Sequence, residues 1–550
     1  MPAESLLPQS LSVAFVGIAG APFDFLPAPF VLLEYFRTKS PQAEHVRSKI
    51  FSYPQLAHGD AHFAARCDGI LADVEMFLRE QVARDGRTKK IVCFSCYTWN
   101  IDALHRVSAA LKEAMDDLTI IWGGPEISRQ FIIEGAYDAS AADYLFHGEG
   151  EVALTKLLDV FVRGASVDLD AIGNLAHRRC DRYACTEVVN QHLDLGQSPS
   201  YILAGAADEV LARAGMSLNV ETQRGCNFRC AYCNYHKSFP GIRYRDPQLV
   251  VREILHAREL GCEAVRITDA NFVSDKAHAL AILNALIAAQ VKMRLMVECL
   301  PQFVDPEIAD AFGRYVQGRE NRVIVGIGIQ SLNEESMRTV RRSIRRQHFE
   351  RAFQLLEANG VLIKSDIILG LPFETRESYH TLLAFVLDLQ QSGRNLTSMG
   401  LLRILPGTDL VAIARETGLV YDPSDSEHYV YATPTMNRAD MLHCLRLNTA
   451  VARVISARDD QKKMRLRDLY YRVKHSQGMS HVDVLERLAS GFMTYLTSQG
   501  SDSDFCKPDF PDAEYYYTYR VDNEIPDDVV VDILTQIERP TAEAGEGALH

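Results

Sequence analysis

The chain has 550 residues, of which 47% are hydrophobic and 24% are charged, and this is enough apolar material for several domains. Its formal net charge of −14 at pH 7 argues against nucleic acid as a partner, because phosphates select basic surfaces. No apolar run reaches the roughly 18 residues of a membrane span, and residues 1–10 lack the features of a secretory signal. We therefore expect a cytoplasmic protein without membrane contact, whose 12 cysteines include metal ligands rather than disulfides.

The first 165 residues alternate short apolar runs with helical patterns. Strands are expected at residues 11–19, 49–54, 89–97, 118–125 and 143–151, and helices at residues 70–82 and 101–115. Strands that alternate with helices predict a parallel, doubly wound, Rossmann-like α/β sheet. Ligands of such sheets bind beyond the carboxyl ends of the strands, so the loops that follow these strands are the candidate binding elements.

A second alternating series follows a connector at residues 166–212, in which a hairpin is expected near residues 177–190. Its strands are expected at residues 217–225, 264–272, 293–300, 322–331, 362–372 and 396–407. Six strand–helix units predict a partial (β/α)6 barrel of the TIM type over residues 213–425, with its chemistry at the carboxyl ends of the strands. Residues 426–550 show amphipathic helical patterns and predict a mostly helical C-terminal domain.

The stretch GCNFRCAYC places Cys226, Cys230 and Cys233 directly after the first strand of the predicted barrel. Thiolates suit iron–sulfur clusters, and three cysteines in one loop can hold three irons of a 4Fe-4S cube while the fourth iron stays open for another ligand. The alternatives are a structural zinc site, for which His236 is the local candidate for a fourth ligand, and three unrelated buried cysteines. The spacing favours the cluster.

This CxxxCxxC loop, with an aromatic residue before its last cysteine, resembles the radical S-adenosylmethionine (SAM) superfamily. In that superfamily the open iron chelates SAM, and an electron from the cluster cleaves SAM to give a radical. The stretches ILGLPFET and LRILPGT resemble the motifs on its fifth and sixth strands. The resemblance implies catalytic and metal-binding roles for the three cysteines. It also implies SAM contacts at Tyr232, Asp269, Glu298, Gln330, Ile368 and Leu405, with Asn271 beside Asp269.

Three loops of the N-terminal domain, SCYTWN, WGGPE and HGEGE, each follow a predicted strand. Their glycines allow the backbone to approach a bulky ligand closely. Together with the barrel, this domain resembles the cobalamin-binding domain of cobalamin-dependent radical SAM enzymes, although degenerate loops that bind nothing are the alternative. The resemblance implies cobalamin contacts at Ser95, Tyr97, Thr98, Trp99, Asn100, Gly123, Gly124, Pro125, Glu126, Gly148, Glu149 and Gly150.

The DxHxxG motif, whose histidine binds cobalt in other cobalamin domains, is absent from the sequence. His105 has the wrong spacing and lies on a predicted helix, so we interpret it as an ordinary helix residue. Cobalamin-dependent radical SAM proteins usually lack the motif as well. His58, His62 and Arg66 are alternative neighbours of the lower face of cobalt, and each is more simply a solvated loop residue.

The resemblance implies a methyltransferase that acts on a poorly reactive carbon of a small metabolite or natural-product intermediate. Its cofactors would be a 4Fe-4S cluster, SAM and cobalamin, and the cluster would make it oxygen-sensitive and dependent on a donor such as flavodoxin or ferredoxin. Cyclisation or rearrangement without net methyl transfer is one alternative. A methylthiotransferase, which needs a second N-terminal cluster, and a non-catalytic cobalamin carrier or sensor are the others.

Overall fold

The computed structural model describes residues 9–21, 24–56, 62–86, 88–164, 168–188, 193–316, 323–390, 396–423, 427–455, 461–501 and 525–538. The chain divides into two compact units. The first unit comprises Met1–Glu298 and Leu405–Val411, and the second comprises Cys299–Ile404 and Ala412–His550.

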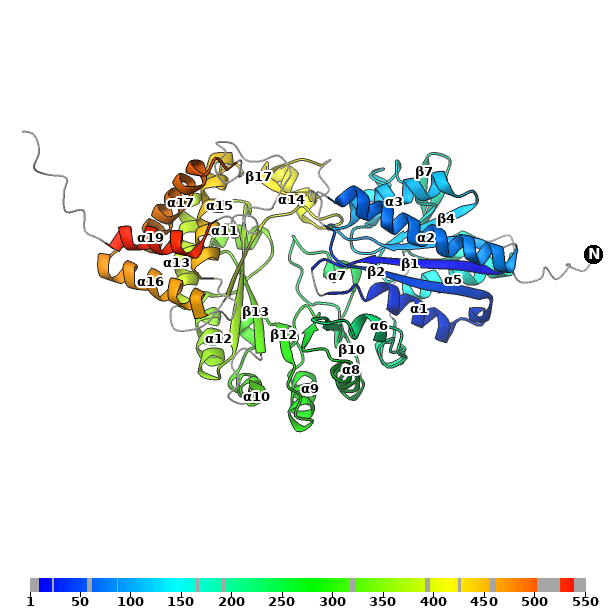
Figure 1. Cartoon of the computed structure of the whole chain (residues 1–550), viewed down its shortest axis with the longest axis horizontal. Helices are drawn as coiled ribbons and strands as arrows, with labels where there is room; N and C mark the ends of the chain where they lie inside the picture. The colour runs from blue at the N-terminus through cyan, green and yellow to red at the C-terminus, as the bar shows by residue number, and fades with distance from the viewer. Residues whose placement is uncertain are drawn as a thin grey trace, which may run out of the picture. The chain divides into compact units, whose positions relative to one another are not determined.

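The N-terminal part of the first unit is a seven-stranded sheet with the order β2-β1-β3-β4-β5-β6-β7 (Figure 1). Strands β1 to β5 are parallel, and β6 and β7 add an antiparallel hairpin at one edge. The strands are β1 (Leu11–Ile18), β2 (Val46–Tyr53), β3 (Lys89–Ser95), β4 (Leu118–Gly123), β5 (Tyr144–Phe146), β6 (Leu175–Arg179) and β7 (Arg182–Cys185). The predicted Rossmann-like sheet is confirmed, and the hairpin expected in the connector pairs with β5.

Helices cover both faces of this sheet (Figure 1). All residues of β1 are buried because helices cover both faces of the sheet. Val16 packs with α2 and α3 on one face, and Phe15 packs with α1 and α5 on the other. These helices are α1 (Ala28–Lys39), α2 (Phe63–Asp85), α3 (Ile101–Ala114), α4 (Arg129–Ile133) and α5 (Glu151–Arg163). The chain leaves β1 for β2 on one side and reaches β3 on the other, which places a topological switch point beside β1.

The rest of the first unit contributes three parallel strands in the order β12-β11-β8, with a short β9–β10 hairpin. The strands are β8 (Ser217–Val220), β9 (Gln223–Arg224), β10 (Arg243–Tyr244), β11 (Ala264–Ile267) and β12 (Arg294–Glu298). The helices are α6 (Asp208–Leu211), α7 (Tyr235–Ser238), α8 (Pro247–Glu259) and α9 (Lys276–Ala288). The β9–β10 hairpin encloses the segment that carries the three cysteines.

The second unit contributes three further parallel strands in the order β15-β14-β13, so all six predicted barrel strands are present. They are β13 (Val323–Gln330), β14 (Leu362–Leu369) and β15 (Leu396–Leu401). The helices between and after them are α10 (Pro306–Val316), α11 (Glu334–Thr339), α12 (Arg346–Ala358), α13 (Arg376–Leu389) and α14 (Leu410–Thr417). A small antiparallel pair, β16 (Val420–Tyr421) and β17 (Val430–Ala432), completes the barrel region.

The C-terminal part of the second unit is helical, as predicted. Its helices are α15 (Arg438–Val454), α16 (Gln461–Gln477), α17 (His481–Ser498) and α19 (Asp527–Glu538). Capping boxes begin α13, α15 and α17, at Thr375, Asn437 and Ser480, and these satisfy backbone amides that the first helical turn leaves without partners. The three helices pack against one another and therefore present side chains to a shared interior.

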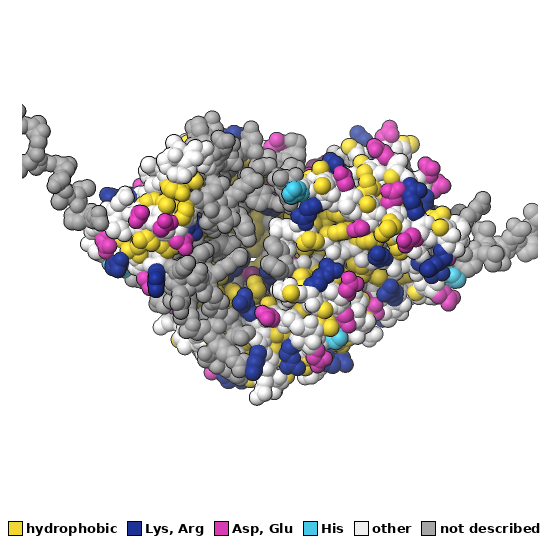
Figure 2. All heavy atoms as spheres, in the orientation of Figure 1, with side chains coloured by type: hydrophobic (Ala, Val, Ile, Leu, Met, Phe, Trp, Pro, Cys, Tyr) yellow, Lys and Arg dark blue, Asp and Glu magenta, His cyan; other side chains and the backbone are white. Residues whose placement is uncertain are grey.

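Among the described residues, none of the helices has the length and apolar character needed to cross a membrane. Acidic and basic side chains are interspersed over the described surface of the first unit on the face shown in Figure 2. The charges on that face are therefore mixed rather than gathered into one basic or acidic area.

Candidate active site

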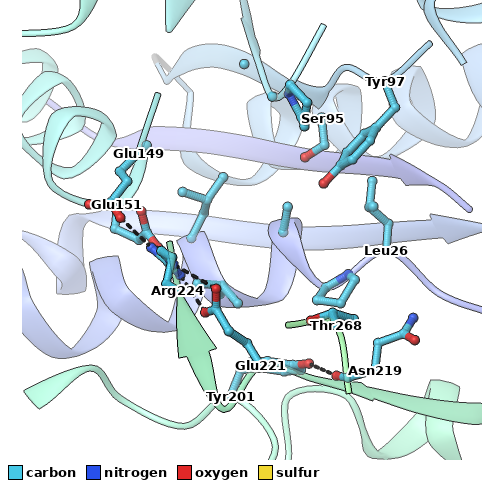
Figure 3. Close-up of a pocket in the computed structure, with 18 of the residues that line it drawn as sticks. Leu26, Ser95, Tyr97, Glu149, Glu151, Tyr201, Asn219, Glu221, Arg224 and Thr268 are labelled. Carbon is cyan, nitrogen blue, oxygen red and sulfur yellow. Dashed lines mark hydrogen bonds and ion pairs between the residues drawn. The ribbon is translucent and has the colours of Figure 1, made fainter. Parts of the chain in front are cut away.

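A cavity of about 630 Å³ lies within the first unit, at the carboxyl ends of the strands of the N-terminal sheet (Figure 3). Loops that follow β1, β3, β4 and β5 line one part of it. Residues of β8 and β9, and Tyr235 from the helix after the cysteine segment, line another part. The cavity therefore joins the edge of the sheet to the immediate surroundings of the three cysteines.

The loops singled out in the N-terminal sequence meet at this cavity. Their lining residues are Ser95, Tyr97, Trp99, Gly123, Gly124, Pro125, Gly148, Glu149 and Gly150. Thr98, Asn100 and Glu126 complete the predicted set but do not line it. Asn100 is buried and holds the loop instead: its Oδ1 accepts from Tyr97 N at 2.8 Å, and its Nδ2 donates to Ser95 O at 3.0 Å.

Two of these loops are in direct backbone contact. Cys96 N donates to Gly123 O at 2.7 Å, and Glu126 N donates to Cys96 O at 3.3 Å. Gly124 has a φ of 127°, and a Cβ atom at this position would lie 2.4 Å from Cys96 O. Only glycine fits such an approach, so the close pairing of the SCYTWN and WGGPE loops depends on this residue.

Sequence reasoning missed the loop after β1, which contributes Gly20, Asp24, Phe25 and Leu26 to the cavity. The signal was a glycine- and proline-rich stretch, AGAPFDFLP, next to the switch point of the sheet. Asp24 fixes this loop, because it accepts from the Asn219 side chain of β8 and from Arg266 Nη1 of β11 at 3.2 Å. The connector was also missed, and its Pro199, Tyr201 and Ile202 close another side.

A buried ion network crosses the cavity wall (Figure 3). Arg224 donates to Glu221 at 2.9 Å, to Glu151 at 2.8 Å and to Glu149 at 3.2 Å, and Arg243 donates to Glu149 at 3.1 Å. Burial opposes the ionisation of Glu151, but Arg224, a backbone hydrogen bond and Arg243 together lower the pKa of the Glu151 carboxyl below its usual value. The network ties the β9–β10 hairpin to the first turn of α5.

The cysteine segment is held by its backbone. Cys233 N donates to Cys230 O at 3.0 Å, and Ala231 O accepts from Leu410 N at 2.9 Å. Gly225 precedes the first cysteine with a φ of 103°, and a Cβ atom there would lie 1.7 Å from Gly241 O. The segment thus folds back on itself so closely that position 225 requires glycine.

The side chain of Cys230 is buried, and those of Cys226 and Cys233 are partly exposed. Among the described residues, histidine, cysteine and carboxylate ligand atoms come within 4.8 Å of one another in one group of three only, and that group contains none of these cysteines. The three sulfur atoms are therefore spread more widely than one tetrahedral zinc ion requires. A three-iron face is wider than a single ion, and this favours the cluster over the zinc alternative.

The predicted SAM contacts are placed in several different surroundings. Tyr232 and Leu405 are partly buried residues of the first unit, Ile368 is a partly buried residue of β14 in the second unit, and Glu298 is exposed at the end of β12. Gln330 ends β13 with a φ of 66°, a backbone conformation that costs energy for a residue other than glycine. Which of these residues contact SAM stays a prediction.

Asp269 is buried, and its carboxylate is already engaged. Its Oδ1 accepts from Thr222 N at 2.8 Å and from Gln223 N at 3.1 Å, and its Oδ2 accepts from the Thr222 hydroxyl. Burial raises the pKa of Asp269 to about 7. Asp269 therefore supports the strand end that leads into the cysteine segment. Its neighbour Asn271 is buried as well, and its backbone O accepts from the Gln223 side chain at 2.7 Å.

Other histidines and cysteines have simpler roles. His105 packs edge-on against Trp122, with ring centroids 4.7 Å apart, as its interpretation as a helix residue predicts. His58 lies outside the described residues, and Arg66 donates to Gln55 O beside exposed His62. Cys93 and Cys96 pack in the cores on opposite faces of the N-terminal sheet. They therefore cannot share the second cluster that a methylthiotransferase needs.

The comparisons with known proteins agree with this geometry. The radical SAM superfamily profile matches residues 220–386. TokK of Streptomyces tokunonensis, a cobalamin-dependent radical SAM methyltransferase, is 24% identical over 315 residues, which are 54% of this chain and 45% of TokK. The 2-(S-pantetheinyl)-carbapenam-3-carboxylate methyltransferase of Streptantibioticus cattleyicolor is 22% identical over 392 residues, which are 66% of this chain and 56% of that enzyme. The chain thus spans about half the length of these relatives.

The fold has a solved counterpart. OxsB, a cobalamin-dependent S-adenosylmethionine radical enzyme determined with aqua-cobalamin and SAM bound, aligns with a TM-score of 0.62 over 96% of this chain and 80% of OxsB, at 12% identity. At this identity the likeness concerns the fold alone. The profile match adds the cysteine segment and the barrel strands around it. Residues 220–386 thus match the radical SAM superfamily, and the fold of the chain is like that of OxsB.

Proposed function

We propose that this chain is a cobalamin-dependent radical SAM methyltransferase that acts on a poorly reactive carbon of a small molecule. The observation that carries the proposal is the shared cavity. It is lined by the loops at the edge of the N-terminal sheet and also by Arg224 and Tyr235, which flank the cysteine segment. Groups held on the two sides of one cavity react without diffusing apart, and this is the advantage of joining the two domains in one chain.

The residues fit the proposed groups. Three thiols in one segment, which begins after Gly225, supply soft ligands for a 4Fe-4S cluster and leave one iron for SAM. Glycines at the sheet edge, above all Gly124, give the close backbone approach that a broad ring such as corrin needs. When bound, the cluster with SAM supplies hydrogen abstraction, and methylcobalamin supplies the methyl group.

The residues of the chain prepare the cavity for this chemistry. Phe25, Leu26 and Phe146 give it apolar walls that exclude water from reactive groups. The Tyr97 hydroxyl reaches the cavity (Figure 3), and burial raises the pKa of Tyr97 to about 12, so it stays a hydrogen-bond donor at neutral pH. Arg224 pairs with three glutamates around it, and Arg243 supplies a second positive charge to Glu149.

The test is anaerobic expression with cobalamin supplied, followed by iron and cobalt analysis and a visible spectrum. We expect about four irons and about one cobalamin per chain. With SAM, a low-potential reductant such as flavodoxin or ferredoxin, and substrate, both 5′-deoxyadenosine and S-adenosylhomocysteine should form. The variant Cys226→Ala should lose iron and both products, whereas Cys180→Ala, which changes an exposed cysteine of the hairpin, should keep them.

Other outcomes identify the alternatives. Iron without cobalamin would remove the methyl-transfer proposal and keep the barrel chemistry. Cobalamin without iron would indicate a carrier or sensor. Formation of 5′-deoxyadenosine from SAM without S-adenosylhomocysteine would indicate cyclisation or rearrangement without net methyl transfer.

A further inference from the structure

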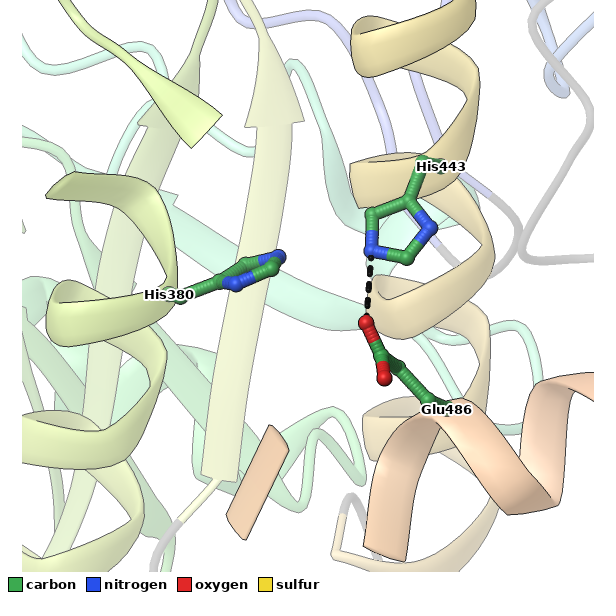
Figure 4. A group of neighbouring side chains, drawn as sticks. All are labelled: His380, His443 and Glu486. Atoms are coloured by element: carbon green, nitrogen blue, oxygen red, sulfur yellow. Dashed lines mark ion pairs between the residues drawn. The ribbon is translucent and has the colours of Figure 1, made fainter. Parts of the chain in front are cut away.

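Three metal-binding side chains converge in the second unit, apart from the cysteine segment (Figure 4). His380 lies on α13, His443 on α15 and Glu486 on α17. One ligand atom from each lies within 4.8 Å of the other two. The side chains come from three helices that pack against one another, so the fold holds them together.

The spacing suits a single ion. His443 Nε2 and Glu486 Oε1 are 3.3 Å apart, close to the edge of about 3.3 Å in a tetrahedron whose metal–ligand bonds are about 2.0 Å. The Nε2 atoms of His380 and His443 are buried and make no hydrogen bond with any described residue. A buried nitrogen that makes no hydrogen bond lowers the stability of the folded protein unless another partner, such as a metal ion, binds it.

The electrostatic surroundings of the two imidazoles favour their neutral form, which is the form that binds a metal ion. Burial and the nearby Arg376 lower the pKa of both histidines, to about 4 for His443, so both rings are neutral at neutral pH and offer lone pairs. Arg376 also contacts Glu486 Oε1 at 3.4 Å and would compete with a cation there. Its side chain is 40% exposed, so it can turn away into solvent when an ion binds.

We propose that His380, His443 and Glu486 bind one divalent zinc ion that fastens α13, α15 and α17 together. Two imidazoles and one carboxylate form a ligand set typical of zinc, and the fourth position is left for water. The alternative is a polar contact between the helices without a metal ion. The site lies in the second unit and uses none of the residues of the proposed cofactor cavity. The inference therefore holds whether or not the proposed function is correct.

The experiment measures zinc affinity by chelator competition on the cluster-loaded holoenzyme, in which iron already occupies the three cysteines. Wild type should bind one zinc ion more tightly than His443→Gln, Glu486→Gln or His380→Gln, with at least a tenfold loss of affinity in each variant. Zinc should also raise the melting temperature of wild type and leave that of the variants unchanged. The control is His475→Gln, an exposed histidine of α16, which should behave as wild type.

A second variant keeps the test decisive if the ligand variants fold poorly. Arg376→Ala removes the competing cation without touching a ligand, so it should tighten zinc binding. Equal affinity in wild type and His443→Gln, or weaker binding in Arg376→Ala than in wild type, overturns the proposal. Because neither SAM nor cobalamin enters these measurements, the result is separate from the outcome for the proposed function.

Discussion

Gly124 shows how one residue sets the shape of the cofactor cavity. Its Cβ-free backbone lets the WGGPE loop lie against Cys96, where an alanine Cβ would sit 2.4 Å from a carbonyl oxygen. The variant Gly124→Ala should push the two loops apart and weaken cobalamin binding by at least about tenfold, because the edge of the sheet loses its shape. Equilibrium dialysis with hydroxocobalamin measures this loss.

The control variant is Gly164→Ala, which adds backbone strain without a steric contact. Gly164 has a φ of 62°, and no atom lies within 4 Å of the position that its Cβ would take. Gly164→Ala should cost about 1 kcal/mol of stability and leave cobalamin binding intact. Iron content should stay at the wild-type value in both variants. Loss of iron in Gly124→Ala would show instead that the fold of the whole unit had collapsed.

Asp269 predicts a pH dependence of stability. Burial and, to a smaller extent, nearby Glu221 raise its pKa from 3.8 to about 7, although hydrogen bonds from Thr222 and Gln223 act in the opposite direction. Between these two pKa values the folded state binds more protons than the unfolded state, so stability falls as the pH rises through this window. Above about pH 7 this contribution no longer changes.

The variant Asp269→Asn isolates that effect. The amide oxygen can still accept from Thr222 N and Gln223 N, as the carboxylate does now. Melting temperatures between pH 5 and pH 8 should therefore decline less steeply in the variant than in wild type. Parallel slopes for the two proteins would mean that Asp269 does not carry the shift.

The β9–β10 hairpin illustrates control at the scale of one element. It has only two residues in each strand, so its backbone pairing alone is weak. Arg224 compensates by joining β9 to Glu151 in the first turn of α5 and to Glu149 just before it. Since the cysteine segment lies inside the hairpin, the position of that segment depends on this ion network.

Removing Arg224 should therefore be costly. Arg224→Ala leaves buried carboxylates without their main cation, and we expect a loss of about 3–5 kcal/mol in the free energy of unfolding. Arg179→Ala is the matched control, because Arg179 pairs with Asp170 at an exposed site where ion pairs contribute about 0–1 kcal/mol. Denaturant unfolding of the two variants gives the comparison, and a loss below 1 kcal/mol in Arg224→Ala would contradict a structural role for the network.

At the scale of the whole molecule, the sequence predicted the elements better than the site. Apolar runs such as β1 and the six barrel strands are recognisable because burial on both faces demands them. The strand expected at residues 143–151 ends at Phe146, because the glycine at position 148 has a φ of 84° and turns the chain. The motifs on three single loops located one part of the cavity lining, whereas the loop after β1, the connector and β8 were not predicted to line it.

The residues that sequence reasoning missed share one property: their role depends on distant partners. Asp24 matters through Asn219 and Arg266, which lie far along the chain. His380 and Glu486 meet only because α13 and α17 pack together. A single sequence contains no local pattern that pairs such positions. Local spacing therefore predicts the cysteine ligands and the glycine-rich loops, whereas contacts between distant residues come from the fold alone.

The arrangement of the first unit leads to a prediction about cofactor binding and dynamics. A bound ligand slows the local opening of the segments that contact it. At a ligand concentration of about 100 times the dissociation constant, binding adds about 2.7 kcal/mol to the free energy of opening, and amide exchange becomes roughly a hundredfold slower. Hydroxocobalamin added to the anaerobic protein should therefore protect the segments 24–28, 95–99 and 198–202, each of which contributes residues to the cavity lining. Helices α16 and α19, which belong to the second unit, should exchange at an unchanged rate. Hydrogen–deuterium exchange mass spectrometry measures both regions together. Protection that spares residues 95–99 would place cobalamin elsewhere, because those residues form the edge of the cavity at the carboxyl end of β3.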